Sequence, residues 1–362
     1  MPNTCELIPF EGDTCVLCKT LETAPQAMAD PIEKERLLNE QIEQIREKGQ
    51  GRPYDCVVGV SGGRDSTYLL YLLTQKHRLR CLAVYYRTPF THDVVDGNIR
   101  RIVQYLGADF EEIQLSQEYH RRIAREMIEI WKKNRHHLII NLACAPCKLL
   151  NRETYQIAKR RGVSTIVYGG NIYEAVQIAA GVSKKQVIGK SGRKIINLTS
   201  KIRKMLALIW NGTKLLVTTP AVWKYLVLGV KSSIMYISPH ALYLALRYPH
   251  IKAIDYYYGA TWSEKECEET LEKLGWQRPP GCNSSWKADC CFAEIKNVLF
   301  KKTLGITYAD AFFSNMVRAG VMTRDEALRR FQTEGKLSPE RLKETRDILG
   351  LHEPLFEGDE LG

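Results

Sequence analysis

Seven residues between a predicted strand and a predicted helix carry the clearest chemical pattern in this chain. The run Ser61–Thr67 (SGGRDST) directly follows the apolar stretch Tyr54–Val60 and directly precedes a helical stretch. A strand that turns through glycines into a helix N-terminus builds an anion site. Gly62 and Gly63 let backbone N–H groups approach an anion, and the helix dipole adds partial positive charge. The lysine of a P-loop is absent from this spacing, which argues against a kinase or GTPase of that type. The alternative is an ordinary polar turn.

The second chemical pattern is the pair Cys144 and Cys147 in NLACAPCKLL, which precedes a predicted basic helix. A thiol at a helix N-terminus beside cations is expected to have a lowered pKa, because the dipole and the cations favour the thiolate. Thiolates at this spacing can bind a metal, carry a persulfide or form a disulfide. The alternative is two packed cysteines near a turn.

A later cysteine cluster, in GCNSSWKADCCFAE, could complete a three-cysteine site with Cys144 and Cys147. The candidates for the third ligand are Cys290 and Cys282. Three protein ligands leave one coordination position open, as a reactive centre requires and a closed structural site does not. The sequence therefore predicts iron–sulfur or zinc binding here.

Apart from Cys267, which we expect to be an ordinary helix residue, the remaining cysteines divide into a terminal group and two core positions. Cys5, Cys15 and Cys18 are typical of a zinc knuckle that lacks one ligand. Cys56 and Cys81 lie in apolar strand stretches, so we expect them to be core residues.

The glycine loop resembles that of the PP-loop ATP pyrophosphatases, which grip the β,γ-pyrophosphate of ATP. The resemblance implies that an acceptor carbonyl oxygen attacks the α-phosphorus, so that pyrophosphate leaves and AMP becomes an easy leaving group. Mg²⁺ would offset the charge of the pyrophosphate. Asp65 would orient the loop or a metal-bound water in catalysis, and Arg64 would stabilise phosphate charge, unless it simply faces solvent. The implied ATP-binding residues are Ser61, Gly62, Gly63, Arg64, Asp65, Ser66, Gly169, Gly170 and Asn171.

A longer resemblance, over most of the chain, is to the bacterial N-acetyl sugar amidotransferases, which are PP-loop enzymes of surface-polysaccharide biosynthesis. It is carried by the cysteine-bearing N-terminus, YDCVVGVSGGRDSTYLLYLL, IVYGGNIYE and SNMVRAGVMTRDEAL. That family is understood to use ATP and ammonia from a partner glutaminase–synthase pair on a nucleotide-linked sugar.

The chain departs from that family at Cys144 and Cys147. A CxxC before a helix, with a later third cysteine, is similar to the PP-loop enzymes that thiolate tRNA, where the cysteines hold a 4Fe-4S cluster or handle sulfur. We therefore expect an ATP-dependent sulfurtransferase, supplied by a sulfur donor protein. The alternative is a sugar amidotransferase whose cysteines bind structural zinc. A third hypothesis is a non-catalytic nucleic-acid-binding protein, although such a protein would not need the intact glycine loop.

The charge of the chain is strongly uneven. The net charge is +11, and between Glu174 and Asp255 thirteen Lys and Arg occur without one acidic residue. This predicts an anionic partner, such as tRNA, a nucleobase, a nucleotide sugar or a phospholipid surface, unless the basic face only aids solubility. Within this segment, Met205–Ile237 is apolar but interrupted by lysines and a proline, so we expect no transmembrane segment. We favour a buried helical pair there; a membrane-surface helix or a homodimer face are alternatives.

The elements that must position these residues alternate between strand and helix from Tyr54 to Gly169. This alternation predicts an α/β fold with a parallel sheet and helices on both faces, of the adenine nucleotide alpha-hydrolase-like (HUP) type. The 44% hydrophobic content of the 362 residues suffices for a full core. Eleven cysteines and the absence of a leader sequence predict a cytoplasmic location. The expected organisation is a cysteine-bearing appendage at 1–30, a linking amphipathic helix at 31–53, an ATP-binding domain at 54–200 and a mainly helical region at 201–362.

Overall fold

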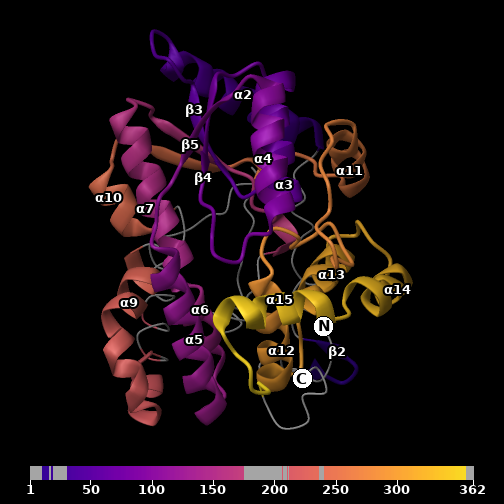
Figure 1. Cartoon of the computed structure of the whole chain (residues 1–362). Coiled ribbons are helices and arrows are strands. Elements are labelled where there is room, and N and C mark those ends of the chain that lie inside the picture. The colour runs from indigo at the N-terminus through magenta and orange to yellow at the C-terminus, as the bar shows by residue number, and fades with distance from the viewer. Residues whose placement is uncertain are drawn as a thin grey trace.

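The computed structural model describes residues 10–15, 18, 31–174, 206, 210, 212–235 and 240–355. Its centre is a parallel sheet in the order β5-β4-β3-β6-β7 (Figure 1). The strands are β3 (Cys56–Val60), β4 (Cys81–Tyr85), β5 (Asp109–Glu112), β6 (Thr165–Tyr168) and β7 (Lys252–Asp255). The chain starts in the middle of the sheet, extends to one edge and then returns to build the other. This doubly wound arrangement confirms the predicted α/β class and puts the strand-order reversal beside β3.

The central strands are apolar on both faces because each face is covered. Side chains along a strand point alternately to opposite sides. Val57 accordingly packs into one core, whereas Cys56 and Val58 pack into the other. Cys56 and Cys81 are 0% and 4% exposed, which confirms that they are core residues.

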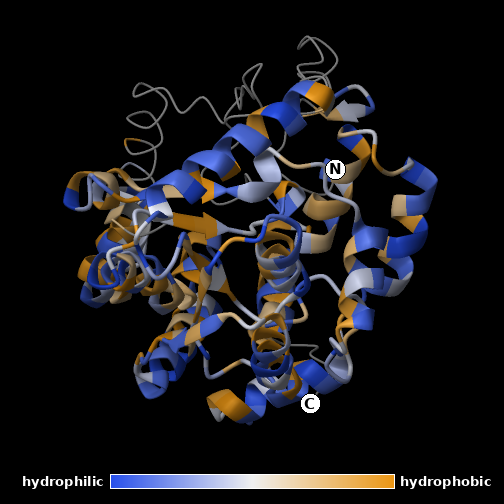
Figure 2. Ribbon diagram, turned by 90° about the horizontal axis from the view of Figure 1, so that it is seen from above, coloured by the Kyte–Doolittle hydropathy of each residue, from blue (hydrophilic) through white to orange (hydrophobic). Residues whose placement is uncertain are grey.

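Two helical layers cover the sheet. On one face lie α2 (Pro31–Gly49), α3 (Arg64–Tyr71, continued by a π-helical turn at Leu72–Lys76) and α4 (Asp93–Leu106). On the other lie α7 (Ala145–Arg160) and α10 (Leu242–Arg247). Figure 2 shows the corresponding distribution, with apolar residues on the central strands and hydrophilic residues on the outer sides of the helices. The helix α2 is amphipathic, as expected, and three of its apolar residues are buried against the sheet: Leu38, Ile42 and Ile45.

A separate helical core lies below the sheet in Figure 1. It is built mainly by α5 (Gln117–Lys133), α6 (His137–Ala143), α12 (Phe292–Leu304) and α15 (Pro339–Leu349). The 3-10 helix Pro220–Tyr225 and the short helix α9 (Leu226–Val230) pack against it. Three further helices complete the C-terminal part: α11 (Glu264–Lys273), α13 (Tyr308–Arg318) and α14 (Arg324–Glu334).

Two elements differ from the sequence expectation. The edge strand β7 pairs with β6 and draws residues from both sides of position 200 into one sheet. It was missed because it has only four residues, none of them fully buried. The helix α6, directly before the CxxC, was missed because its seven residues are too few for a helical period to be recognised.

The predicted buried pair at Met205–Ile237 is correct only in part, as far as the described residues show. Leu215, Val222 and Leu228 are buried, but Trp210 and Val227 are 73% and 65% exposed. The segment therefore carries apolar side chains on its outer side as well. None of the helices in the described residues has both the length and the apolar character needed to cross a membrane.

Candidate ATP and thiol site

The glycine loop lies where the sequence predicted it, between the end of β3 and the start of α3. Gly62 has a positive φ of 78°, and a Cβ there would stand 2.6 Å from Cγ1 and 2.8 Å from the backbone oxygen of Val95. Only glycine fits these two constraints. Gly63 precedes the first residue of α3, and no described side chain caps this helix. The first N–H groups of α3 are thus available to an anion, as the prediction of a phosphate site requires.

The two serines of the loop hold it in shape. The Oγ atoms of Ser61 and Ser66 are 3.1 Å apart, and the Ser61 N–H donates to Ser66 Oγ at 3.1 Å. At the end of the loop Thr67 donates its hydroxyl to the carbonyl oxygen of Gly63 at 2.7 Å.

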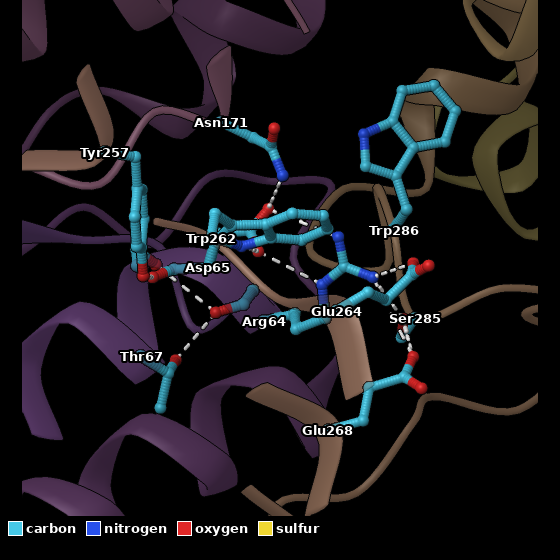
Figure 3. A network of polar contacts seen from close by, with 12 residues as sticks. Arg64, Asp65, Thr67, Asn171, Tyr257, Trp262, Glu264, Glu268, Ser285 and Trp286 are labelled. Carbon is cyan, nitrogen blue, oxygen red and sulfur yellow. Dashed lines mark hydrogen bonds and ion pairs between the residues drawn. The ribbon is translucent and has the colours of Figure 1, made fainter. Parts of the chain in front are cut away.

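Asp65 is the centre of a polar network (Figure 3). Its carboxylate accepts hydrogen bonds from Asn171 Nδ2 at 3.2 Å and from Trp262 Nε1 at 3.1 Å. Its backbone oxygen accepts one from the Tyr257 hydroxyl at 2.8 Å. Burial raises the pKa of Asp65, and the cation of Arg64 and the amide of Asn171 oppose that rise. Two segments distant in sequence therefore converge on the Asp65 carboxylate, and its orienting role in catalysis stays a prediction.

Arg64 is buried rather than facing solvent, with an exposed fraction of 2%. Its guanidinium donates to Asp65 at 3.1 Å, to Glu264 at 2.6 Å and to Ser285 Oγ at 2.8 Å. In Figure 3 the side chain runs away from the loop toward Glu264 and Ser285. The residue thus ties the glycine loop to α11 and to the loop before α12. Its predicted contact with phosphate stays a prediction.

The residues that follow β6, at positions 169–171, lie against the first turns of α3. A Cβ on Gly169 would stand 3.1 Å from Leu69 Cβ and 3.2 Å from the backbone oxygen of Asp65. Asn171 is buried and joins this block to Asp65. By contrast, a Cβ on Gly170 would meet nothing within 4 Å. The structure therefore brings two of the three predicted residues, Gly169 and Asn171, to the glycine loop and leaves Gly170 beside open space.

The loop that carries the second cysteine cluster lies across the glycine loop. A Cβ on Gly63 would stand 3.2 Å from both Cβ and Cγ of Asp289. The next residue is Cys290, one of the predicted third ligands. Sequence reasoning did not find this contact, because the two segments are more than two hundred residues apart in the chain.

Three tryptophans hold these distant segments at the site, and none was singled out from the sequence. Besides Trp262, the indole N–H of Trp276 donates to the backbone oxygen of Gly62 at 3.0 Å. The indole N–H of Trp286 donates to Glu174 at 2.6 Å, and its ring stacks on Phe312 with centroids 4.4 Å apart. A buried indole N–H needs a hydrogen-bond acceptor, so each of these hydrogen bonds holds two distant segments of the chain together.

The thiols of Cys144, Cys147 and Cys290 lie close enough to interact electrostatically with one another. Cys147 Sγ is 3.4 Å from His120 Nε2. The pKa of the Cys147 thiol is raised to about 12, mainly by burial and also by the charge of Cys144, against the opposing effect of Lys148 and Lys296. The expectation of a lowered thiol pKa is therefore wrong for Cys147, since burial outweighs the cations.

Two lysines, Lys148 and Lys296, interact with this thiol group, and a third, Lys287, interacts with Asp289; the sequence did not identify them as site residues. Burial lowers the pKa of Lys148, and repulsion from Lys296 adds to that effect. Burial also acts to lower the pKa of Lys296, but Cys144 and Tyr308 outweigh it and the pKa is raised. Lys287 forms an ion pair with Glu174 at 3.1 Å. The site is therefore rich in cations next to the predicted phosphate loop.

The other predicted metal ligands are placed differently. The thiol of Cys282 interacts with Arg341, Glu294 and Arg278, and burial raises its pKa to about 11. Cys15 and Cys18 have their Sγ atoms 3.2 Å apart, next to the short hairpin of β1 (Phe10–Glu11) and β2 (Thr14–Cys15). Cys5 lies outside the described residues.

Within the described part of the chain, no group of three or more His, Cys, Asp or Glu side chains is arranged to hold a metal ion. The iron–sulfur site and the zinc sites thus stay predictions. The donor set of Cys144, Cys147 and Cys290 nevertheless fits an iron–sulfur cluster in chemical type, because such clusters are held by thiolates.

Comparisons with known proteins gave only distant structural likenesses. No family model matches the sequence, and no curated protein matches it. Among solved structures, NMN synthetase from Francisella tularensis is similar at 12% identity, covering 90% of this chain and 99% of that chain with a TM-score of 0.39. The U34-tRNA thiolase NcsA from Methanococcus maripaludis with its [4Fe-4S] cluster is similar at 13% identity, covering 88% and 82% with a TM-score of 0.33. At these scores neither likeness supports an assignment of function.

Proposed function

We propose that this chain activates a carbonyl oxygen of its acceptor with ATP and then replaces that oxygen with sulfur. The observation that supports the proposal is the contact between Gly63 of the glycine loop and Asp289, because the next residue is Cys290, which interacts electrostatically with Cys144 and Cys147. Displacement of AMP by ammonia does not require thiols near the glycine loop, whereas the proposed sulfur transfer depends on them.

In the first step the glycine loop and the N-terminus of α3 would bind the pyrophosphate part of ATP. The acceptor oxygen attacks the α-phosphorus, the bond to the β-phosphate oxygen breaks, and pyrophosphate leaves with its charge offset by Mg²⁺. Lys148, Lys287 and Lys296 supply further positive charge at this site. Preorganised cations stabilise a transition state in which negative charge builds up on phosphate oxygens.

In the second step a sulfur nucleophile attacks the adenylated carbon, and AMP leaves with the former carbonyl oxygen. Cys144, Cys147 and Cys290 would hold the sulfur-handling group. An iron–sulfur cluster, when bound by these thiolates, would supply an open position for sulfur. The raised pKa of Cys147 is consistent with a thiol that is neutral until a metal or a sulfur donor engages it.

The same raised pKa supports an alternative, in which the thiols take no part and ammonia displaces AMP from a nucleotide-linked sugar. A neutral, buried thiol is a poor nucleophile. The cationic surroundings of the glycine loop would suit a nucleotide sugar as well as a tRNA.

The two functions are separated by measuring each step by itself. Purified anaerobically, the full chain is incubated with ATP, Mg²⁺ and either total tRNA or a UDP-N-acetyl sugar, with sulfide or ammonium as the nucleophile. Pyrophosphate release reports the first step, and mass spectrometry of the acceptor reports the second. We expect Cys147→Ser to release pyrophosphate but form no thiolated product.

Cys282→Ser is the matched control, because its thiol faces Arg341 and Glu294 rather than Cys147. Cys282→Ser should both release pyrophosphate and form the thiolated product. Full product formation by Cys147→Ser would exclude the sulfurtransferase, and ammonium-dependent AMP release with the sugar, indifferent to sulfide, would establish the alternative. No pyrophosphate release with any acceptor would exclude both.

A further inference from the structure

The outer side of one helical segment is apolar. In the 3-10 helix Pro220–Tyr225 and in α9, the four residues Trp223, Leu226, Val227 and Val230 are 56%, 39%, 65% and 42% exposed. We call these four side chains the outer stripe. Their spacing of three, four and seven residues puts them along one side of the helical segment. In Figure 1, α9 lies at the outer edge of the molecule, beside α5 and α6.

The opposite side of the same segment is apolar too. Val222, Tyr225 and Leu228 are buried in the helical core. A surface helix of a water-soluble domain normally turns polar residues outward, so an apolar outer stripe calls for a partner.

The helical segment that carries the outer stripe is anchored to its neighbours by polar contacts. Lys224 forms an ion pair with Glu126 of α5 at 2.9 Å. The indole N–H of Trp223 donates to the backbone oxygen of Leu216 at 3.1 Å, which joins the stripe to the preceding helical stretch at 212–218. Val217 of that stretch is 74% exposed and extends the apolar surface. The exposure therefore belongs to folded, anchored helices.

The charged residues in the chain segment that carries the stripe are all basic, and the acidic neighbour Glu126 of α5 is paired with Lys224. Exposed lysines lie on both sides of it along the chain, at Lys214 and Lys231. The whole stretch 175–254 contains thirteen Lys and Arg and no acidic residue. A partner of this surface must therefore accept both apolar side chains and positive charge.

We propose that the outer stripe docks on the surface of an anionic phospholipid bilayer. An interfacial helix inserts its apolar side chains at the boundary of headgroups and acyl chains, and flanking lysines pair with anionic headgroups. Tryptophan is favoured at that depth because one edge of its ring is polar. The chain would then be attached to a membrane from one side without crossing it.

Two other partners fit the surface less well. A second copy of the chain would bring the same basic, acid-free segment opposite itself, because a two-fold interface pairs a patch with its own image. A nucleic acid would use the lysines and the indole, but Leu226, Val227 and Val230 have no flat face on which a base could stack.

The test is cosedimentation of the full chain with vesicles. One set is phosphatidylcholine alone, and the other contains about one third phosphatidylglycerol, a fraction that creates a negative surface potential. We expect binding to the anionic set only, weakened when NaCl is raised to about 0.5 M because salt screens the lysines. The variant Leu226→Gln/Val227→Gln/Val230→Gln should lose at least about tenfold in partition coefficient, because the inserted apolar area is removed.

The matched control removes three exposed apolar side chains elsewhere: Ile32→Gln/Val321→Gln/Leu328→Gln, whose positions are 76%, 48% and 49% exposed. It should bind as the wild type does. Circular dichroism of both triple variants confirms that they are folded. Lys214→Gln/Lys231→Gln should bind more weakly and with a smaller dependence on salt.

The proposal is overturned if the wild type binds neither vesicle set, or if the stripe variant binds as tightly as the control variant. It is also overturned if light scattering reports a dimer that the stripe variant dissociates while vesicles are ignored. Retention of tRNA that the stripe variant weakens, without binding to either vesicle set, would assign the surface to nucleic acid instead. None of these outcomes depends on the enzymatic reaction proposed above.

Discussion

Gly63 and Asp289 are in contact: a Cβ added to the glycine would stand 3.2 Å from the Cβ of the aspartate. Through this one contact the loop that binds phosphate in the proposed reaction meets the loop that carries Cys290. Two segments with separate chemical signals in the sequence are thereby parts of one site. Changes at the contact should affect ATP and thiol chemistry together.

Gly63→Ala tests this contact. The backbone at Gly63 has φ −73° and ψ 163°, which any residue adopts, so a cost can arise only from the new methyl group. That methyl would press on Asp289 and on Ser61 Oγ, each at 3.2 Å. We expect ATP binding to weaken about tenfold, equivalent to about 1.4 kcal/mol, as measured by titration calorimetry. The free energy of unfolding should change by about 1 kcal/mol or less.

Gly97→Ala is the matched control for Gly63→Ala, because a Cβ at that position of α4 meets nothing within 4 Å. It should bind ATP as the wild type does and gain slightly in stability, since alanine favours a helix over glycine. Wild-type affinity in Gly63→Ala would show that the contact with Asp289 has no part in binding nucleotide.

Arg64→Lys addresses the buried ion pairs beneath the site. The guanidinium donates to Asp65, Glu264 and Ser285 from a side chain that is almost fully buried. A lysine cannot reproduce this fork of donors, so at least one of the two carboxylates loses a hydrogen bond from a buried cation. We expect a loss of about 3 kcal/mol in the free energy of unfolding, measured with urea. Arg36→Lys, on the exposed side of α2, should lose less than about 1 kcal/mol. Equal losses in the two variants would contradict the structural role of Arg64.

The sequence and the structure agree where a signal is local. The run SGGRDST predicted a strand, a turn and a helix start, because glycine and the apolar periodicity act over a few residues. The burial of Arg64 could not be predicted in the same way, since its partners Glu264 and Ser285 lie two hundred or more residues away. The predicted lowering of the Cys147 thiol pKa was wrong for a related reason. A helix N-terminus can be recognised in sequence, but the burial that outweighs it at Cys147 depends on the tertiary packing.

Asn171→Ala should change the pH dependence of pyrophosphate release. Burial raises the pKa of Asp65, whereas Arg64 and the amide of Asn171 counteract that rise. Without the amide, the pKa of Asp65 should rise further, because the ionised carboxylate loses a hydrogen bond. If the loop requires ionised Asp65, the acidic limb of the pH–rate profile should move to higher pH.

Asn315→Ala is the control for this shift. Its amide donates to the backbone oxygen of Tyr173 at 2.7 Å, so it borders the same block without touching Asp65. The acidic limb of the pH–rate profile of Asn315→Ala should coincide with that of the wild type. An unshifted limb in Asn171→Ala, at reduced overall rate, would mean that Asn171 only positions the loop and does not set the ionisation of Asp65.

His137→Gln should make the protein less sensitive to acid. The pKa of His137 is lowered to about 4, mainly by burial and also by the charge of His136, whose ring centroid lies 4.6 Å away. An unfolded histidine titrates near pH 6.5. Because the folded pKa is the lower one, the unfolded state binds more protons as the pH falls below about 6.5. The stabilising contribution is therefore complete above that pH and declines toward pH 4. Between pH 7 and pH 5 the free energy of unfolding in urea should fall by about 1 kcal/mol more in the wild type than in His137→Gln, since the partial exposure of the ring limits the effect.

His250→Gln replaces an exposed histidine and should follow the wild type. Parallel losses in the wild type and in His137→Gln would mean that His137 does not contribute to acid sensitivity.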